Sequence, residues 1–113
     1  MDEQLIKKYN PMTETTYYTL LSVKVPRHGY AIMQFVSELT KKRIQLGTGT
    51  LYTMLGRLVE DQLILILSVE NGKKTYQITD IGLKLVHLEI ERLKHQLENG
   101  IQIFYKEGQD DRK

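Results

Sequence analysis

Cysteine and tryptophan are both absent from this chain of 113 residues, and proline occurs only twice. Without cysteine the protein can form neither disulfides nor thiolate metal sites, and it suits a reducing compartment. The longest apolar run, Leu63–Leu67, is far shorter than the roughly 18 residues that a membrane-spanning helix needs. The first residues are polar and acidic, so no secretory signal is predicted there. We therefore expect a cytoplasmic protein without a membrane partner.

The charge of the chain is small in total but uneven along the sequence. The length suits a single domain with one hydrophobic core. The formal net charge is +2, yet the segment from Lys24 to Val59 holds six basic residues and only one acidic residue. Such a local excess can neutralise several DNA phosphates, although any one of these residues is more commonly an ordinary solvated charge.

Hydrophobic periodicity predicts three helices in the first half of the chain. They cover Asn10–Val25, His28–Lys42, and a segment from near Thr48 to near Asp61. Thr13 or Thr15 is expected to cap the first helix, and Pro26 ends it because the residue before a proline avoids helical backbone angles. The basic residues 41–43 fall in the last turn of the second helix, where the helix dipole favours cations.

The third predicted helix has two chemically different faces. An apolar stripe at helical spacing is formed by Leu51, Leu55, Leu58 and Val59. The opposite face carries small hydrogen-bonding groups and one arginine, which suits the major groove of DNA. Thr48 or Thr50 is expected to cap this helix. Gly56 costs about 1 kcal/mol relative to alanine inside a helix, so we expect either a partner surface or another helix to approach it closely.

The second half of the chain predicts a β-hairpin followed by a long helix. The strands are Leu63–Val69 and Lys74–Ile78, with Asn71-Gly72 as the turn, and this ribbon must lie on the helices to be stable. Thr79 is expected to cap the final helix. Its apolar residues recur at steps of three and four, close to a coiled-coil seam.

A final helix of about 25 residues would span about 37 Å, which is more than a small core can cover. We expect its far end to pair with the same helix of a second chain. The alternative is a single amphipathic helix that folds back on its own domain.

The element order is that of a winged helix, and three motifs give the chain a family resemblance. The segments His28–Ile32, Gly49–Leu58 and Gly72–Gly82 resemble the PadR family of transcriptional regulators, and the similarity covers roughly residues 20–97. It implies a mostly α (α+β) fold: a winged helix-turn-helix with a two-stranded wing and a long C-terminal dimerisation helix. Residues 1–78 would form the DNA-binding domain, with an N-terminal helix at 11–25. Residues 79–106 would form the dimerisation helix, and we expect residues 107–113 to be a frayed tail.

The resemblance also implies a function and a set of site residues. It implies a DNA-binding transcriptional regulator, acting as a repressor, that binds a pseudo-palindromic operator as a homodimer. Dimerisation would use the C-terminal helix with help from the N-terminal one. The candidate DNA-binding residues are Lys41, Lys42, Arg43, Thr48, Thr50, Tyr52, Thr53, Arg57, Lys73 and Lys74. The candidate dimer-interface residues are Val86, Ile90, Leu93, Leu97, Ile101 and Phe104.

Individual roles within these sets stay open at this point. Tyr52 is expected either to pack partly against the second helix or to contact a phosphate through its hydroxyl. Arg57 can read guanine or contact a phosphate. Tyr30 is expected to pack inward with its hydroxyl hydrogen-bonded, next to a tight turn at Gly29. The family commonly has glycine where this chain has Gln62, so we expect the recognition helix to end differently or to carry strain.

Other functional classes find little support in the sequence. The segment Gly47–Thr50 lacks the lysine of a nucleotide-binding loop and does not follow a strand. The three histidines have no metal spacing, and no catalytic triad or carboxylate pair stands out, so we predict no enzyme, no metal and no cofactor. Double-stranded DNA and a second copy are the expected partners, and a small-molecule effector remains unknown. The alternative function is a winged-helix protein-interaction module without specific DNA binding.

Overall fold

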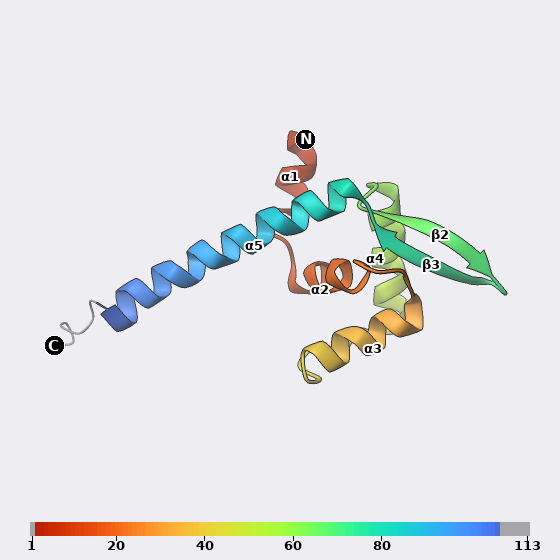
Figure 1. Ribbon diagram of the computed structural model, residues 1–113, viewed down its shortest axis with the longest axis horizontal. Coiled ribbons are helices and arrows are strands. Elements are labelled where there is room, and N and C mark those ends of the chain that lie inside the picture. Colours follow the sequence, from red (N-terminus) through yellow and green to blue (C-terminus); the bar gives the residue numbers. More distant parts are fainter. Residues whose placement is uncertain (1, 107–113) are drawn as a thin grey trace.

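The computed structural model describes residues 2–106 and has the predicted α+β winged-helix architecture (Figure 1). The elements in chain order are α1 (Glu3–Tyr9), α2 (Glu14–Ser22), β1 (Arg27–His28), α3 (Gly29–Leu39), α4 (Thr48–Glu60), β2 (Ile64–Glu70), β3 (Lys73–Ile78), α5 (Asp80–Ile101) and the π-helical η1 (Gln102–Lys106). None of the helices within these residues is long and apolar enough to span a membrane. The predicted frayed tail, residues 107–113, lies outside the described residues.

Helices α2, α3 and α4 form the body of the molecule, and two elements extend from it in opposite directions (Figure 1). The hairpin β2–β3 forms the wing at one end, and the far half of α5 projects at the other, which gives extents of 63 × 34 × 21 Å. The fully buried side chains that hold the body together come from all of these helices and from the base of the wing. They include Leu20, Ile32, Leu51, Leu55, Leu58, Leu63, Ile64 and Leu85.

The N-terminal region differs from the prediction of one helix over residues 10–25. It contains two helices, because Asp2 caps α1 by accepting a hydrogen bond from the Gln4 N–H at 2.8 Å and Pro11 interrupts the helix before α2. Thr13 caps α2, accepting from the Thr16 N–H at 3.2 Å, which confirms one of the two predicted caps. The N-terminal helix is therefore a separate element that can dock elsewhere on the fold.

The sheet has three strands rather than the predicted two. Strand β1 pairs antiparallel with β3, so the order is β1-β3-β2. Two residues are too few to show a strand periodicity, which explains why β1 was not predicted. The predicted turn of the wing is confirmed: Asn71 and Gly72 both have positive φ, at 52° and 76°, as a tight type I′ hairpin requires.

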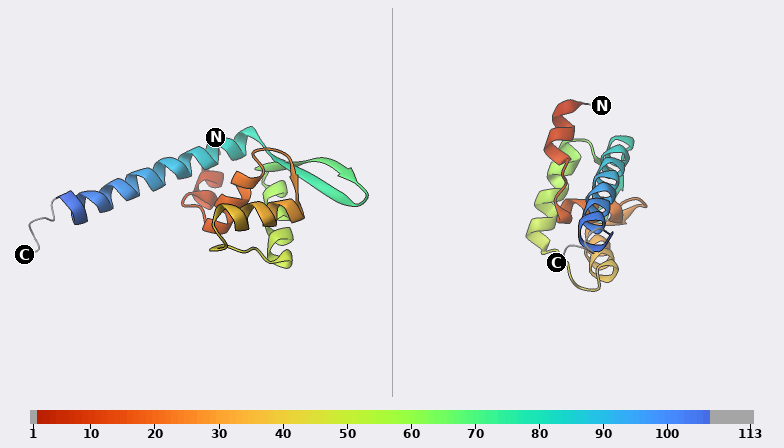
Figure 2. Two further views of the ribbon diagram at one scale, coloured as in Figure 1. Left: turned by 60° about the horizontal axis from the view of Figure 1, so that its bottom comes forward. Right: turned by 90° about the vertical axis from the view of Figure 1, so that its left-hand side faces the viewer.

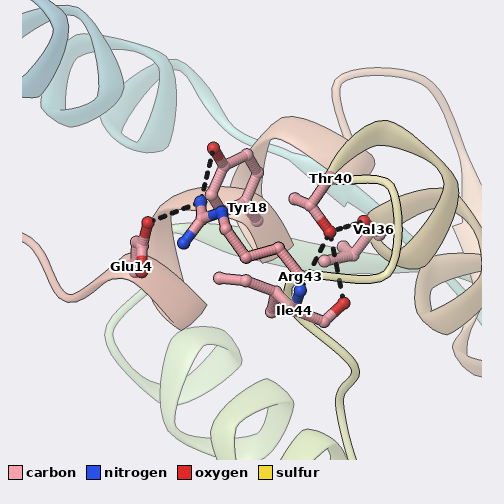
Figure 3. A network of polar contacts seen from close by, with 6 residues as sticks. All are labelled: Glu14, Tyr18, Val36, Thr40, Arg43 and Ile44. Carbon is pink, nitrogen blue, oxygen red and sulfur yellow. Dashed lines mark hydrogen bonds and ion pairs between the residues drawn. The ribbon is translucent and has the colours of Figure 1, made fainter.

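Helix α3 is shorter than predicted and ends at Leu39 instead of Lys42. Thr40 ends it, because its hydroxyl donates to the Val36 carbonyl at 2.8 Å and accepts from the Ile44 N–H at 3.0 Å (Figure 3). Lys41 and Lys42 follow in left-handed backbone conformations, with φ of 54° and 67°. These two lysines therefore belong to the turn before α4 and not to the last turn of a helix.

Gln62 adopts the conformation that glycine usually supplies at a helix end. Its φ is 66°, and the Leu63 N–H donates to the Leu58 carbonyl at 2.9 Å while the Gln62 N–H donates to the Val59 carbonyl at 3.0 Å. These are the two hydrogen bonds of a Schellman motif. The geometry is thus the one expected for glycine, and the side chain costs about 1 kcal/mol of backbone strain.

Candidate nucleic-acid interface

Helix α4 presents the small polar groups that the sequence assigned to DNA on an exposed face. Leu51, Leu55 and Leu58 are at most 1% exposed and anchor the helix in the core. The exposed residues of the helix include Thr48, Thr50, Tyr52, Thr53 and Arg57. The predicted caps were wrong, since Gly47 is the N-cap and makes no side-chain hydrogen bond. The first turn of α4 therefore keeps its threonine hydroxyls free of a capping role.

The exposed face of α4 has two margins. Helical geometry puts Gly49, Thr53 and Gly56 near its centre. Tyr52 lies on the margin next to the wing. The other margin faces α2 and borders a shallow hollow of about 420 Å³. The hollow is lined by Thr15, Gly49, Thr50, Thr53, Met54 and Arg57. A flat or convex partner thus meets little bulk along the middle of the helix.

Gly56 is open to solvent, and a Cβ built there meets no atom within 4 Å in the described part of the chain. Packing against another helix of the described residues is therefore not the reason for the glycine. Gly56→Ala is therefore expected to raise the free energy of unfolding by about 1 kcal/mol through helix propensity, while lowering affinity for DNA. Urea unfolding and DNA titration of the same preparation measure both effects. A loss of stability would show that this face is packed in solution.

The three basic residues before α4 are not equivalent. Arg43 donates to the Glu14 carboxylate at 2.7 Å and to the Tyr18 hydroxyl at 3.5 Å (Figure 3). This contact holds the pKa of Glu14 below its usual value. Lys41 and Lys42 are exposed and form no ion pair with any residue between 2 and 106. The sequence did not anticipate this division, in which Arg43 ties the turn to α2 and the lysines stay available.

Arg57 lies beside a polar cluster that joins α1 to the end of α4. The Tyr9 hydroxyl donates to the Asp61 carboxylate at 2.6 Å, and the Lys8 ammonium pairs with it at 2.7 Å. Burial, then the Asp61 contact, raises the pKa of Tyr9 to about 12, and the Arg57 guanidinium opposes the rise. Lys8, then Tyr9, lowers the pKa of Asp61. Sequence reasoning missed this cluster because it assigned no helix to residues 3–9.

The wing side of α4 brings together residues from three elements. Lys73 and Lys74 are exposed at the start of β3. Gly29 is buried against the phenol of Tyr52. Tyr30 was expected to pack inward, but it is 61% exposed and its hydroxyl only accepts a bond from the Gln34 side chain at 3.3 Å. Gly29, rather than Tyr30, makes the inward contact because the missing side chain leaves room for Tyr52.

The apolar positions of α5 divide into a buried and an exposed set. Val86 is 7% exposed and belongs to the core of its own chain, so it is not free to join a seam. The far part of α5 leaves the body, as the left view of Figure 2 shows, and Leu97 of α5 and Phe104 of η1 are 64% and 78% exposed. A hollow of about 580 Å³ lies there, lined by Leu93, Gln96, Leu97, Gly100, Ile101, Phe104 and Tyr105.

Comparison with known proteins identifies the arrangement. Residues 18–87, which include the end of α2, helices α3 and α4, the wing and the start of α5, match the PadR-like family of transcriptional regulators. The chain belongs to this family. The PadR-like chain is therefore a DNA-binding transcriptional regulator. No group of three metal-ligating side chains exists among residues 2–106.

Several solved structures are similar to this PadR-like chain over most of its length. A PadR family transcriptional regulator from Eggerthella lenta is 27% identical, with a TM-score of 0.59 over 87% of this chain and 79% of that one. A transcriptional regulator from Clostridium thermocellum is 23% identical, with a TM-score of 0.62 over 88% and 96%. RosR from H. salinarum is 22% identical, with a TM-score of 0.62 over 78% and 76%. The last two likenesses concern the fold alone. No curated protein matches the chain.

Proposed function

We propose that this PadR-like regulator is a homodimeric repressor that binds a pseudo-palindromic operator. Helix α4 of each protomer enters a major groove, Lys41, Lys42 and the wing lysines meet the flanking backbone, and the far half of α5 joins the two chains. A dimer bound in this way covers promoter DNA, and this occlusion is the simplest route to repression. The geometry of a two-fold dimer then requires an operator with two half-sites about 34 Å apart, one turn of DNA.

The single observation that carries the proposal is the exposed apolar face of α5. Ile90, Leu97 and Ile101 of α5 and Phe104 of the following η1 are between 36% and 78% exposed. They lie on a helical segment that leaves the body of its own domain. Water-facing apolar rows at steps of three and four residues are the pattern of helices that pair with a second helix. The docked N-terminal helix α1 is available to support the same interface.

The test is a selection of DNA duplexes from a random pool by the wild-type protein. The selected duplex is then titrated with two variants. The wild-type protein is expected to select an inverted repeat. Arg57→Ala is expected to weaken binding by about 1–3 kcal/mol and to relax one base position per half-site, because arginine pairs bidentately with guanine. Lys73→Ala is the matched control: it should weaken binding on all sequences and reduce the salt slope by about one.

Two results would contradict the proposal. Selection of no common sequence at moderate salt would remove the specific operator. A mass measurement that finds a monomer at micromolar concentration would remove the α5 seam. An Arg57→Ala variant with unchanged affinity and unchanged base preference would take Arg57 out of the readout while leaving the operator in place.

A further inference from the structure

A cavity of about 410 Å³ lies between the start of α3, the wing and the recognition helix. It is lined by His28, Gly29, Tyr30, Tyr52, Gly72, Lys73, Lys74 and Tyr76, and we call it the tyrosine cradle. Three phenols, one imidazole and two lysines supply hydrogen-bond donors, and no carboxylate lines it. A pocket with this donor set and no acidic group selects for an anion.

The backbone of α3 contributes to the cradle because Gly29 has no side chain. A Cβ at this position would overlap the hydroxyl and ring end of Tyr52. The phenol of Tyr52 therefore reaches the first turn of α3, where backbone N–H groups lack partners within the helix. His28 caps α3 with its Nδ1, which accepts from the Ala31 N–H at 3.5 Å. Because Nδ1 accepts this bond, the other ring nitrogen, Nε2, is the one that can donate.

Tyr76 points to a ligand independently of the helix terminus. Its side chain is only 5% exposed, yet its hydroxyl forms no hydrogen bond to any residue between 2 and 106. The hydroxyl is also not sealed in the core, since the one enclosed and unpaired side-chain oxygen in that part of the chain belongs to Thr19. Because Tyr76 also lines the cradle, we infer that its hydroxyl opens there. Burial, then the nearby Tyr52, raises the pKa of Tyr76, so the phenol keeps the proton that it can donate.

The lysines at the mouth of the cradle are not neutralised by the protein. Lys73 and Lys74 are exposed and form no ion pair with the described residues. Glu70 is opposite Lys73 in the β2–β3 register, but no ion pair joins the two side chains. Tyr52 lies at the wing-side margin of the α4 face that the proposed function sends into the major groove. The strand of DNA beside that groove passes this margin, which brings its phosphates to the cradle.

We propose that the tyrosine cradle binds one backbone phosphate of the DNA beside the major groove, with the Tyr76 hydroxyl as a donor to it. The proposal rests on the proposed function, because it requires α4 to lie in that groove. This contact gives the wing a fixed register on the duplex. It adds to the nonspecific attraction between the wing lysines and the DNA backbone.

The experiment combines a protein variant with a chemical change in the DNA. The duplex selected by the wild-type protein is resynthesised with single neutral methylphosphonates along the strand that flanks each half-site. One position is expected to cost the wild type about tenfold in affinity, as for the loss of a hydrogen bond to a charged group. Tyr76→Phe should lose about tenfold on unmodified DNA and lose little more when that same phosphate is neutralised. Tyr17→Phe, on α2 away from the cradle, is the control and should behave like the wild type.

The outcomes separate this proposal from the proposed function. If the wild type selects no operator, both fail. If the operator binds normally but no phosphate position couples to Tyr76, the cradle proposal alone is overturned. If circular dichroism shows that Tyr76→Phe folds poorly, Gly29→Ala takes its place, because it displaces the Tyr52 phenol from the cradle. The same coupling to the neutralised phosphate is then expected for Gly29→Ala. A third outcome is that inorganic phosphate binds the cradle at millimolar concentration while no DNA phosphate couples to Tyr76. This result would identify a site for free anions and overturn the assignment to DNA.

Discussion

Glu89→Ala is expected to lower the free energy of unfolding by about 3 kcal/mol. Glu89 is only 2% exposed, although it lies on the long helix α5. Its carboxylate accepts from the Met12 N–H at 3.0 Å and from the Arg92 guanidinium at 2.6 and 3.0 Å. Without it, a buried backbone N–H loses its partner and Arg92 loses its counterion. Urea unfolding at fixed protein concentration measures the loss, and Glu98→Ala, exposed on the same helix, should leave the midpoint unchanged.

The contribution of Glu89 should also depend on pH in a defined direction. Arg92, and then the Met12 N–H, hold the pKa of Glu89 below its usual value of 4.5. A lowered carboxyl pKa stabilises the fold fully above the unfolded value, and the stabilisation is lost as pH falls through the folded value. Wild-type stability should therefore drop below about pH 4.5 by more than that of Glu89→Gln, which cannot titrate. Parallel pH profiles for the two proteins would contradict this role.

Gly82→Ala is the second substitution with a large expected effect, a loss of about 2 kcal/mol from overpacking. Gly82 is buried in the first turn of α5, where a Cβ would overlap the Leu63 carbonyl oxygen and come within 2.7 Å of Ile78 Cγ1. The Leu63 oxygen cannot move freely, because it accepts from the Thr79 N–H at 2.9 Å and the Thr79 hydroxyl at 3.0 Å. This junction joins the base of the wing to α5.

The same change at Gly56 provides the comparison for Gly82. Both glycines lie in helices, so alanine gains a similar helix propensity at each, but only Gly82 has backbone in the way. The two variants are therefore expected to move the urea midpoint in opposite directions. A stabilised Gly82→Ala protein would mean that the start of α5 can shift away from Leu63 at little cost.

Features with a strong local signal could be predicted from the sequence. The Asn71-Gly72 turn needs two residues that tolerate positive φ, and Thr79 is confirmed as the cap of α5, accepting from the Gly82 N–H at 3.1 Å. The apolar stripe of the third helix is likewise confirmed by the burial of Leu51, Leu55 and Leu58. Each depends on residues within a few positions of one another, which is the range over which a pattern carries information.

Features set by contacts between distant segments could not be predicted in this way. The pairing of β1 with β3 joins residues almost 50 positions apart in a strand of only two residues. The burial of Val86 and the exposure of Tyr30 depend on which neighbours tertiary packing supplies. The pairing of Arg43 with Glu14, a residue on α2, neutralises a cation that stays exposed on the surface. The assignments of individual side chains to DNA or to a dimer seam remain predictions.

Residues 8–12 touch the two helices that have separate tasks in the proposed dimer. At one end of this segment Tyr9 and Lys8 hold Asp61, which ends α4, and at the other the Met12 N–H holds Glu89 on α5. The segment thus connects the helix that we propose reads DNA to the helix that we propose joins the chains. In such a dimer, a molecule that tilts one α5 against the other would also move the α4 helix of the same protomer. The distance between the two α4 helices would then change. Induction would then require only a change in the angle between the two α5 helices. No ligand would need to touch the DNA-binding face.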